Sequence, residues 1–323
     1  MPTMRYLSRR LLHAILLLLA VSFLSFAMLQ MAPGDYFDSL RLNPQVSSQT
    51  VEKIRARYAL DRPFPVRYAI WLRSALRGEL GYSIASNSAV APLLGLRARN
   101  TLLLSGTATL LAWLLALPIG IWAAAQRGRW IDRVANLVIS ALLTIPDLLL
   151  FLGLLLFAAR TGWFPTGGMT SASSDSPDFW SSCKDISFHL VLPALGLALA
   201  MLPLLLRHVR AAMMEALDAP FVRAARGHGI ARARLLFRYA LPAASNPLIS
   251  LLGFSVATML STSVIAEMVL SWPGLGALMV ESIFARDTYV VVAIVMLSSV
   301  FLVAGNLLAD LLLFASDPRI RTE

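Results

Sequence analysis

Long apolar runs separated by polar segments dominate the pattern of this chain. Six of them are long enough, at about 1.5 Å per helical residue, to cross a hydrocarbon core about 30 Å thick. They cover residues 11–31, 101–125, 134–159, 190–206, 247–270 and 289–314. Because the runs are continuous and lack the alternating pattern of barrel strands, each is predicted to be a transmembrane helix. The pattern therefore predicts an all-α integral membrane protein with six transmembrane helices.

The composition agrees with a lipid environment. Hydrophobic residues make up 58% of the 323 residues and charged residues 14%, against about 45–50% and 25% in soluble domains. The net charge of +10 does not indicate a nucleic-acid partner, because the basic residues fall between apolar runs, where they orient a membrane protein. The single cysteine, Cys183, and the scattered histidines predict no metal site.

The distribution of arginine predicts that both termini are cytoplasmic. Arginines precede the first run, separate the second from the third, and are most frequent after the fourth, at residues 207–238. The segment at 33–100 carries ten basic residues yet is predicted to lie on the external side of the membrane. This is consistent, because loops longer than about 60 residues are translocated largely regardless of their charge. The first run exceeds the 7–15 apolar residues of a signal peptide, so it is interpreted as a retained helix despite Arg9-Arg10.

The segment between the fourth and fifth runs is an unusual loop. It is interpreted as two short amphipathic helices separated by Gly227 and Gly229. Pro220 begins the first helix, where Ala224 and Ala225 remove bulk from one face. The second carries the apolar side chains of Leu235, Leu236 and Tyr239. Such a hairpin predicts a docking element for another protein.

This loop resembles the EAA motif of binding-protein-dependent ABC importer permeases. The matching residues are Ala224, Ala225, Gly229, Leu241 and Pro242. The family pattern has Glu and Ile where this chain has Arg223 and Tyr239. Arginine at the first of these positions is familiar in the dipeptide/oligopeptide (peptide/nickel) branch, so the departure favours that branch.

Further segments resemble the B-type permease subunits of the same branch, in the same order along nearly the whole chain. They are Pro33-Gly34-Asp35, Leu60-Asp61-Arg62-Pro63, Gly78-Glu79-Leu80-Gly81, Ser271-Trp272-Pro273-Gly274-Leu275-Gly276 and Asp317-Pro318-Arg319-Ile320-Arg321. The resemblance implies a type I ABC importer permease fold in the bacterial inner membrane. It also implies that the short helices of the loop insert into a groove on an ATPase subunit.

The resemblance implies four segments. Residues 1–32 form the cytoplasmic stub and first transmembrane helix, and residues 33–97 form a periplasmic helical segment. Residues 98–314 form the permease core, with the coupling loop at 210–245, and residues 315–323 form a cytoplasmic tail. The expected ATPase-coupling residues are Arg223, Ala224, Ala225, Gly229, Tyr239, Leu241 and Pro242.

The energy source is expected on other chains. No Gly-x-x-x-x-Gly-Lys-Ser/Thr phosphate loop occurs, and the only lysines are Lys53 and Lys184, both in segments predicted to be external. No enzyme activity, catalytic residue or cofactor is therefore expected here, and ATP and Mg belong to the partner subunits.

The implied partners are a second homologous permease, two ATPase subunits, a periplasmic or lipid-anchored solute-binding protein and membrane lipid. A self-contained secondary transporter is the alternative, although no convincing inverted repeat is seen.

Two acids within apolar runs are candidates for the translocation pathway. Asp147 lies near the middle of the third run and Glu267 lies near the outer end of the fifth. A charge at a helix centre costs about 2.5–3.5 kcal/mol, so each side chain should face protein or water. Either could line the pathway or pair with another helix. Four prolines also interrupt the runs: Pro118, Pro146, Pro193 and Pro203. Each is predicted either to kink its helix or to be tolerated within an ordinary membrane helix.

Overall fold

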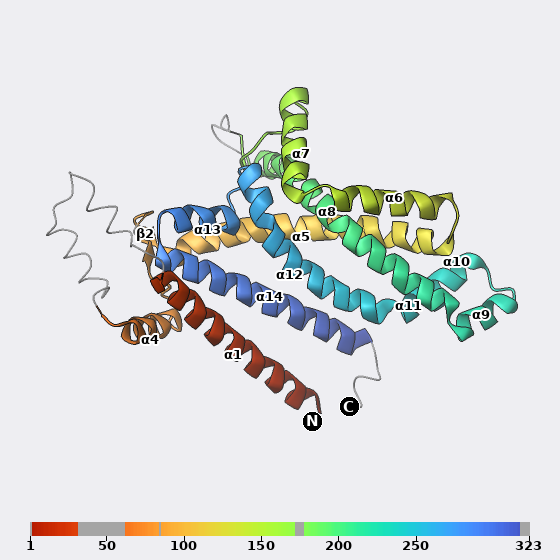
Figure 1. The fold of residues 1–323 in the computed structure, drawn as a ribbon, viewed down its shortest axis with the longest axis horizontal. Helices are drawn as coiled ribbons and strands as arrows, with labels where there is room; N and C mark the ends of the chain where they lie inside the picture. Colours follow the sequence, from red (N-terminus) through yellow and green to blue (C-terminus); the bar gives the residue numbers. More distant parts are fainter. Residues whose placement is uncertain (1, 32–61, 84, 172–177, 317–323) are drawn as a thin grey trace. The chain divides into compact units, whose positions relative to one another are not determined.

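The computed structural model describes residues 2–31, 62–83, 85–171 and 178–316, which are mostly helical (Figure 1). The long helices are α1 (Pro2–Met31), α5 (Val90–Ala125), α8 (Phe179–Asp218), α12 (Ser245–Val269) and α14 (Thr288–Ser316). The shorter ones are α4 (Phe64–Ala75), α6 (Trp130–Thr144), α7 (Asp147–Thr161), α9 (Pro220–Gly227), α10 (Arg232–Leu235), the π-helix η1 (Leu236–Ala240), α11 (Leu241–Ala243) and α13 (Leu275–Phe284). Two short strands, β1 (Tyr82–Ser83) and β2 (Ser88–Ala89), form an antiparallel pair that places Tyr82 opposite Ala89.

Four of the predicted spans correspond to helices long and apolar enough to cross a membrane. These helices are α5, α8, α12 and α14. Two of them extend well beyond the predicted runs: α5 begins at Val90 and α8 covers 40 residues. The described part of α1 contributes a shorter apolar segment, Leu12–Met28. The count of six transmembrane helices therefore stays a prediction.

The third predicted span is not one straight helix. Helices α6 and α7 are bent by 96° relative to each other at a short break, and together they count as one broken span at most. Pro146 lies in the break and immediately precedes α7. Its ring removes a helical N–H and forces Ile145 into an extended conformation (φ −87°, ψ 117°). The other three prolines remain inside α5 and α8: Pro118, Pro193 and Pro203.

The chain divides into two compact units, which are described separately. The first contains Thr101–Pro273 with Met1–Arg5 and Ala304–Glu323, and the second contains Tyr6–Asn100 with Gly274–Val303. The segment boundaries at 32, 97 and 314, which follow the predicted membrane crossings, stay a prediction. Much of the predicted periplasmic helical segment, residues 33–61, lies outside the described residues.

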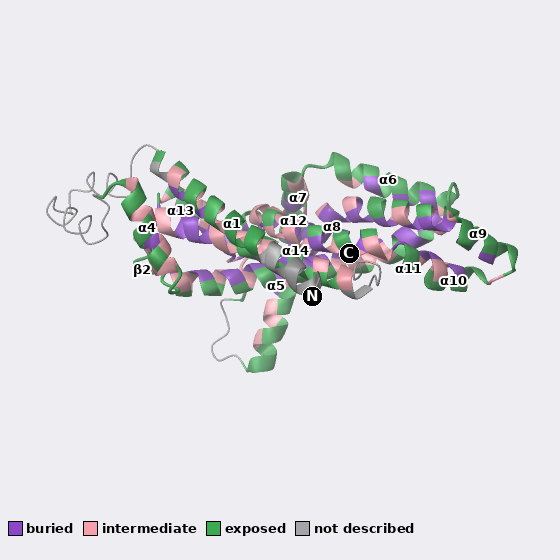
Figure 2. Ribbon diagram, turned by 90° about the horizontal axis from the view of Figure 1, so that it is seen from below, coloured by how far each residue is buried: buried purple, intermediate pink, exposed green. Residues whose placement is uncertain are grey.

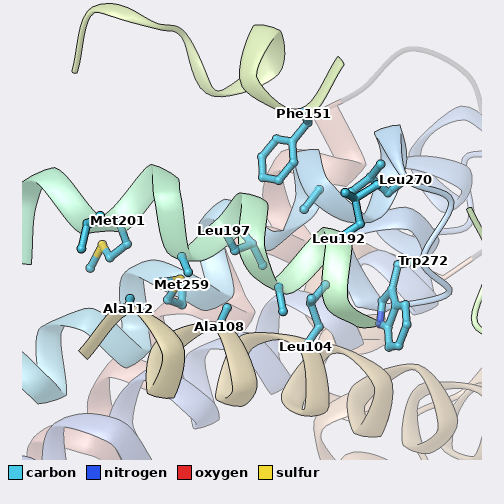
Figure 3. Packing of buried hydrophobic residues seen from close by; sticks show 14 of the residues in the cluster. Leu104, Ala108, Ala112, Phe151, Leu192, Leu197, Met201, Met259, Leu270 and Trp272 are labelled. Atoms are coloured by element: carbon cyan, nitrogen blue, oxygen red, sulfur yellow. The ribbon is translucent and has the colours of Figure 1, made fainter. Parts of the chain in front are cut away.

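The core of the first unit is built on α8, which packs against α6, α7 and α12. Helix α5 presents to this core a stripe at intervals of four residues, Leu104, Ala108, Ala112 and Ala116, each fully buried. Figure 3 shows Leu104, Ala108 and Ala112 directed towards α8, which contributes Leu192, Leu197 and Met201. These small side chains leave room in the core for larger side chains of α8, such as Leu197 and Met201.

A close contact between small residues joins α12 to the last part of α14. A Cβ placed on Gly253 would lie 2.3 Å from the Cβ of Ala309 and 3.4 Å from the carbonyl oxygen of Gly305. Such a distance is far below van der Waals contact, so only glycine fits here. Glycine at this position therefore serves packing between membrane helices, as small residues commonly do.

In the second unit, aromatic packing and one buried carboxylate fix the segment before α5. Trp71 on α4 is buried, packs against Phe26 of α1 and donates through Nε1 to the carbonyl of Leu80 (3.3 Å). Buried Asp287 accepts a hydrogen bond from the Ser83 hydroxyl (2.7 Å), which ties the β1–β2 turn to the start of α14.

Candidate functional site

The loop singled out in the sequence forms a helical hairpin, defined here as residues 220–243 and called the hairpin. It follows directly from α8, whose 40 residues span about 60 Å, about twice the thickness of a hydrocarbon core. The helix is therefore long enough to extend beyond a membrane, and its last turns support the hairpin. A second apolar cluster joins the end of α8 to the hairpin and to α5: Ile121, Ala124, Val209, Met213, Ala216, Leu217, Val222, Leu235, Ala240, Ala244 and Leu248.

The first arm of the hairpin, α9, has a buried and an exposed face. Val222 is buried in the second cluster, and Ala225, three residues later on the same helical face, is also buried. Arg223 and Ala224 are exposed, and Figure 2 shows this alternation of buried and exposed positions along α9. Pro220 occupies the start of the helix, as predicted, where its missing N–H costs no hydrogen bond.

A left-handed glycine makes the turn between the two arms. Helix α9 ends at Gly227, and Gly229 has a φ of +75°. An added Cβ on Gly229 would meet no atom of this chain within 4 Å. The glycine is therefore required here by backbone conformation, and its surface is open to a partner.

The second arm contains a π-helical turn directly before Leu241-Pro242. Leu235 and Ala240 are buried, whereas Tyr239 is half-buried. The ring of Pro242 cannot donate to the carbonyl four residues earlier, that of Arg238, and would collide with it in a regular α-helix. The wider turn of η1 accommodates the proline, and the helix resumes with a hydrogen bond from the Ala244 N–H to the carbonyl of Ala240 (2.9 Å).

The seven predicted coupling residues therefore share one hairpin but differ in access. Arg223, Ala224, Gly229 and Pro242 are exposed, Tyr239 and Leu241 are half-buried, and Ala225 is buried. The side chain of Ala225 packs within this chain, so a docked subunit would contact its neighbours instead.

A buried ion pair that the sequence did not single out supports the same end of the molecule. The guanidinium of Arg210 on α8 donates through Nε to Asp132 Oδ1 (2.6 Å) and through a terminal nitrogen to Oδ2 (3.0 Å). Asp132 also accepts from the N–H of Gly128 (2.9 Å), a left-handed residue in the turn between α5 and α6. Asp132 precedes the apolar run that begins at 134, and the hydrogen bond from Arg210 holds its pKa below the usual range.

The two pathway candidates lie in different environments. Asp147 is half-buried and occupies the first turn of α7, immediately after the break, so it is not in the middle of a continuous span. Its carboxylate therefore lies at the positive, N-terminal end of the helix dipole, which stabilises a negative charge. Glu267 is fully buried on α12 and accepts a hydrogen bond from the hydroxyl of Thr101 (2.6 Å). In the described ranges, no group of three His, Cys, Asp or Glu side chains is arranged to hold a metal ion.

Comparisons with known structures agree with this architecture. A chain of the MetNI methionine ABC transporter, in an inward-facing form, superposes with a TM-score of 0.57 at 17% identity, and the match covers 70% of this chain and 96% of that chain. An amino acid ABC transporter crystallised with histidines gives a TM-score of 0.52 at 19% identity, over 69% of this chain and 94% of its own. The fold is therefore that of ABC importer permeases.

Sequence comparisons are more specific. The oligopeptide transport system permease protein AppB of Bacillus subtilis is 36% identical over 98% of both chains. The glutathione transport system permease protein GsiC of Escherichia coli is 32% identical over 98% of this chain and 99% of its own. Residues 116–322 match the family model for the binding-protein-dependent transport system inner membrane component, and residues 3–109 match the model for its N-terminal part. The chain thus belongs to the family of inner membrane components of binding-protein-dependent transport systems.

Proposed function

We propose that this chain is a permease subunit of an ATP-driven importer and forms half of a pathway for peptides or related small solutes across the bacterial inner membrane. The observation that carries the proposal is the nearly full-length identity of 36% to an oligopeptide transport permease. The hairpin supports it, because its exposed residues surround an open left-handed turn on which another subunit can dock. Family membership favours this function over a self-contained secondary transporter.

The proposed topology has six transmembrane helices and both termini in the cytoplasm. In it, α1 and the broken α6–α7 pair supply the two spans that the helix lengths leave undecided. The hairpin then lies in the cytoplasm, where ATPase subunits are found. A second permease completes the pathway, two ATPase subunits supply ATP and Mg, and a periplasmic or lipid-anchored binding protein delivers the cargo.

The proposed mechanism is alternating access. Closure of the ATPase dimer on ATP moves the hairpin, and the packing of Val222 and Leu235 against α8 and α5 transmits that movement to the membrane helices. Hydrolysis then returns the helices to the inward-facing arrangement. Asp147 is proposed to line the pathway beside the break. Burial of Glu267 and its bond to Thr101 favour a structural role for that residue.

Co-purification from the native membrane tests the docking role. The variant is Gly229→Arg, and its matched control is Gly162→Arg, because Gly162 is also left-handed (φ +66°) and also has no atom within 4 Å of an added Cβ. We expect the wild type and the control to bring down an ATPase and a second permease, and Gly229→Arg to lose only the ATPase. If no ATPase accompanies the wild type under conditions that retain other membrane complexes, the importer proposal fails and a self-contained transporter is favoured.

A further inference from the structure

A basic pocket lies beside the hairpin, apart from its predicted ATPase contacts. It has a volume of about 500 Å³ and is enclosed by the end of α5, the turn to α6, the end of α8 and the turn between α9 and α10. Its charged lining consists of Arg127, Arg129, Arg226, Arg232 and one acid, Asp218. None of the seven predicted coupling residues is among its lining residues.

The pocket retains unneutralised positive charge. Asp218 pairs with Arg127 at 3.2 Å, and Arg232 donates to the carbonyl of Ala125 at the end of α5. Among the residues that the structure describes, neither Arg129 nor Arg226 has an acidic partner. Guanidinium groups gathered around one cavity repel one another unless an anion lies between them, and phosphate oxygens match their geometry.

The surroundings of the pocket indicate which phosphate it accepts. Its remaining lining is largely apolar and includes Met214, Ile230 and Leu236. Two exposed tryptophans flank the α5–α6 turn, Trp122 (59% exposed) and Trp130 (69% exposed). Exposed tryptophan marks the interface between membrane and water, and basic pockets on the cytoplasmic side of membrane helices bind acidic headgroups.

We propose that this pocket binds the headgroup of an anionic phospholipid, with Arg129 and Arg226 contacting the phosphodiester. The apolar lining receives the glycerol end, and the tryptophans keep the turn at the membrane surface. Because Arg129 belongs to the α5–α6 turn and Arg226 to the last turn of α9, the bound phosphate would join the hairpin to the membrane helices. The site does not depend on the importer function, since lipid binding is measured directly.

Lipid binding to the purified complex tests the site. The probe is phosphatidylglycerol, with phosphatidylcholine as the neutral reference, and bound lipid is counted by native mass spectrometry. The pocket variant is Arg129→Gln with Arg226→Gln, and the matched control is Arg234→Gln with Arg238→Gln, two exposed arginines outside the pocket. We expect the preference for phosphatidylglycerol to fall about 30-fold in the pocket variant, because two juxtamembrane arginines would supply a preference of that size. The control should keep the wild-type preference.

Several results would overturn the proposal. An equal loss in both variants would indicate general surface charge, and competition by inorganic phosphate as strong as that by glycerol phosphate would indicate a free-anion site. Lipid that binds only after the ATPase subunits are removed from the complex would assign the pocket to an acidic segment of those subunits. If the pocket variant does not fold, crosslinking of a photoactivatable phosphatidylglycerol to the wild type tests the site instead. Crosslinks to residues 124–129 or 226–236 support the site, and their absence there overturns it.

Discussion

At the scale of single residues, the ion pair between Asp132 and Arg210 predicts a large loss of stability on substitution. The side chains are 7% and 22% exposed, so Asp132→Asn leaves a guanidinium largely buried without its anion. Because water partly screens the charge of Arg210, we expect the free energy of unfolding to fall by about 2–3 kcal/mol. Thermal unfolding of the purified chain in detergent measures it.

The matched control is Asp218→Asn, which breaks the pair between Asp218 and Arg127. These side chains are 70% and 63% exposed, so the expected loss is at most about 1 kcal/mol. Equal losses for the two variants would mean that burial does not set the strength of these pairs.

The same ion pair predicts how stability responds to pH. Arg210 lowers the folded-state pKa of Asp132, so the contribution is complete above the unfolded value of about 3.9 and is lost as pH falls through the lower folded value. The difference in unfolding midpoint between wild type and Asp132→Asn should therefore stay constant from about pH 6 to pH 8. A difference that shrinks within that range would show that another group titrates with the pair.

Residue chemistry was only partly predictable from the sequence. The positive φ of Gly229 and the start of α9 at Pro220 follow from local rules and agree with the structure. The pairing of Asp132 with Arg210 does not follow from local rules, because 78 residues separate the two and only the packing of α6 on α8 brings them together. For the same reason the pattern could not show that Ala225 is buried while Ala224 is exposed.

At the scale of elements, the contact between α12 and α14 predicts a steric defect. Gly253→Ala would place a Cβ 2.3 Å from that of Ala309, so the helices must separate, at a cost of about 1–3 kcal/mol. Gly153→Ala on α7 is the control, since an added Cβ there meets no atom within 4 Å. It should be neutral or stabilising by up to about 1 kcal/mol.

A second substitution separates this steric effect from a general one. Ala309→Gly removes the methyl group that Gly253→Ala would meet, so the double variant should recover most of the lost unfolding midpoint. Additive losses in the double variant would show that the two helices do not touch at this point.

Element boundaries were predictable where apolar runs ended in polar residues. Helix α12 (Ser245–Val269) and helix α14 (Thr288–Ser316) agree closely with the runs at 247–270 and 289–314. The bend between α6 and α7 was left open as one of two alternatives for Pro146, because hydropathy is continuous across this residue and three other prolines remain inside helices. Whether a proline breaks a helix depends on what packs around it, which no local pattern records.

At the scale of the whole molecule, the proposed orientation predicts opposite access at the two ends of α8. Cys183, the only cysteine of the sequence, is exposed near the start of this helix, and His228 is exposed in the hairpin beyond its end. About 60 Å of helix separates these ends. The arginines at 207–238 should hold the hairpin in the cytoplasm, so Cys183 should face outwards.

Labelling with a membrane-impermeant maleimide measures this orientation. In intact spheroplasts the wild type should be labelled at Cys183, and Cys183→Ser should not be labelled. Cys183→Ser combined with His228→Cys should be labelled only after the membrane is permeabilised. Labelling of both sites from the same side would mean that α8 does not cross the membrane, and the reverse pattern would place the hairpin outside. In that case no cytoplasmic ATPase could reach Gly229, because the membrane itself would lie between them.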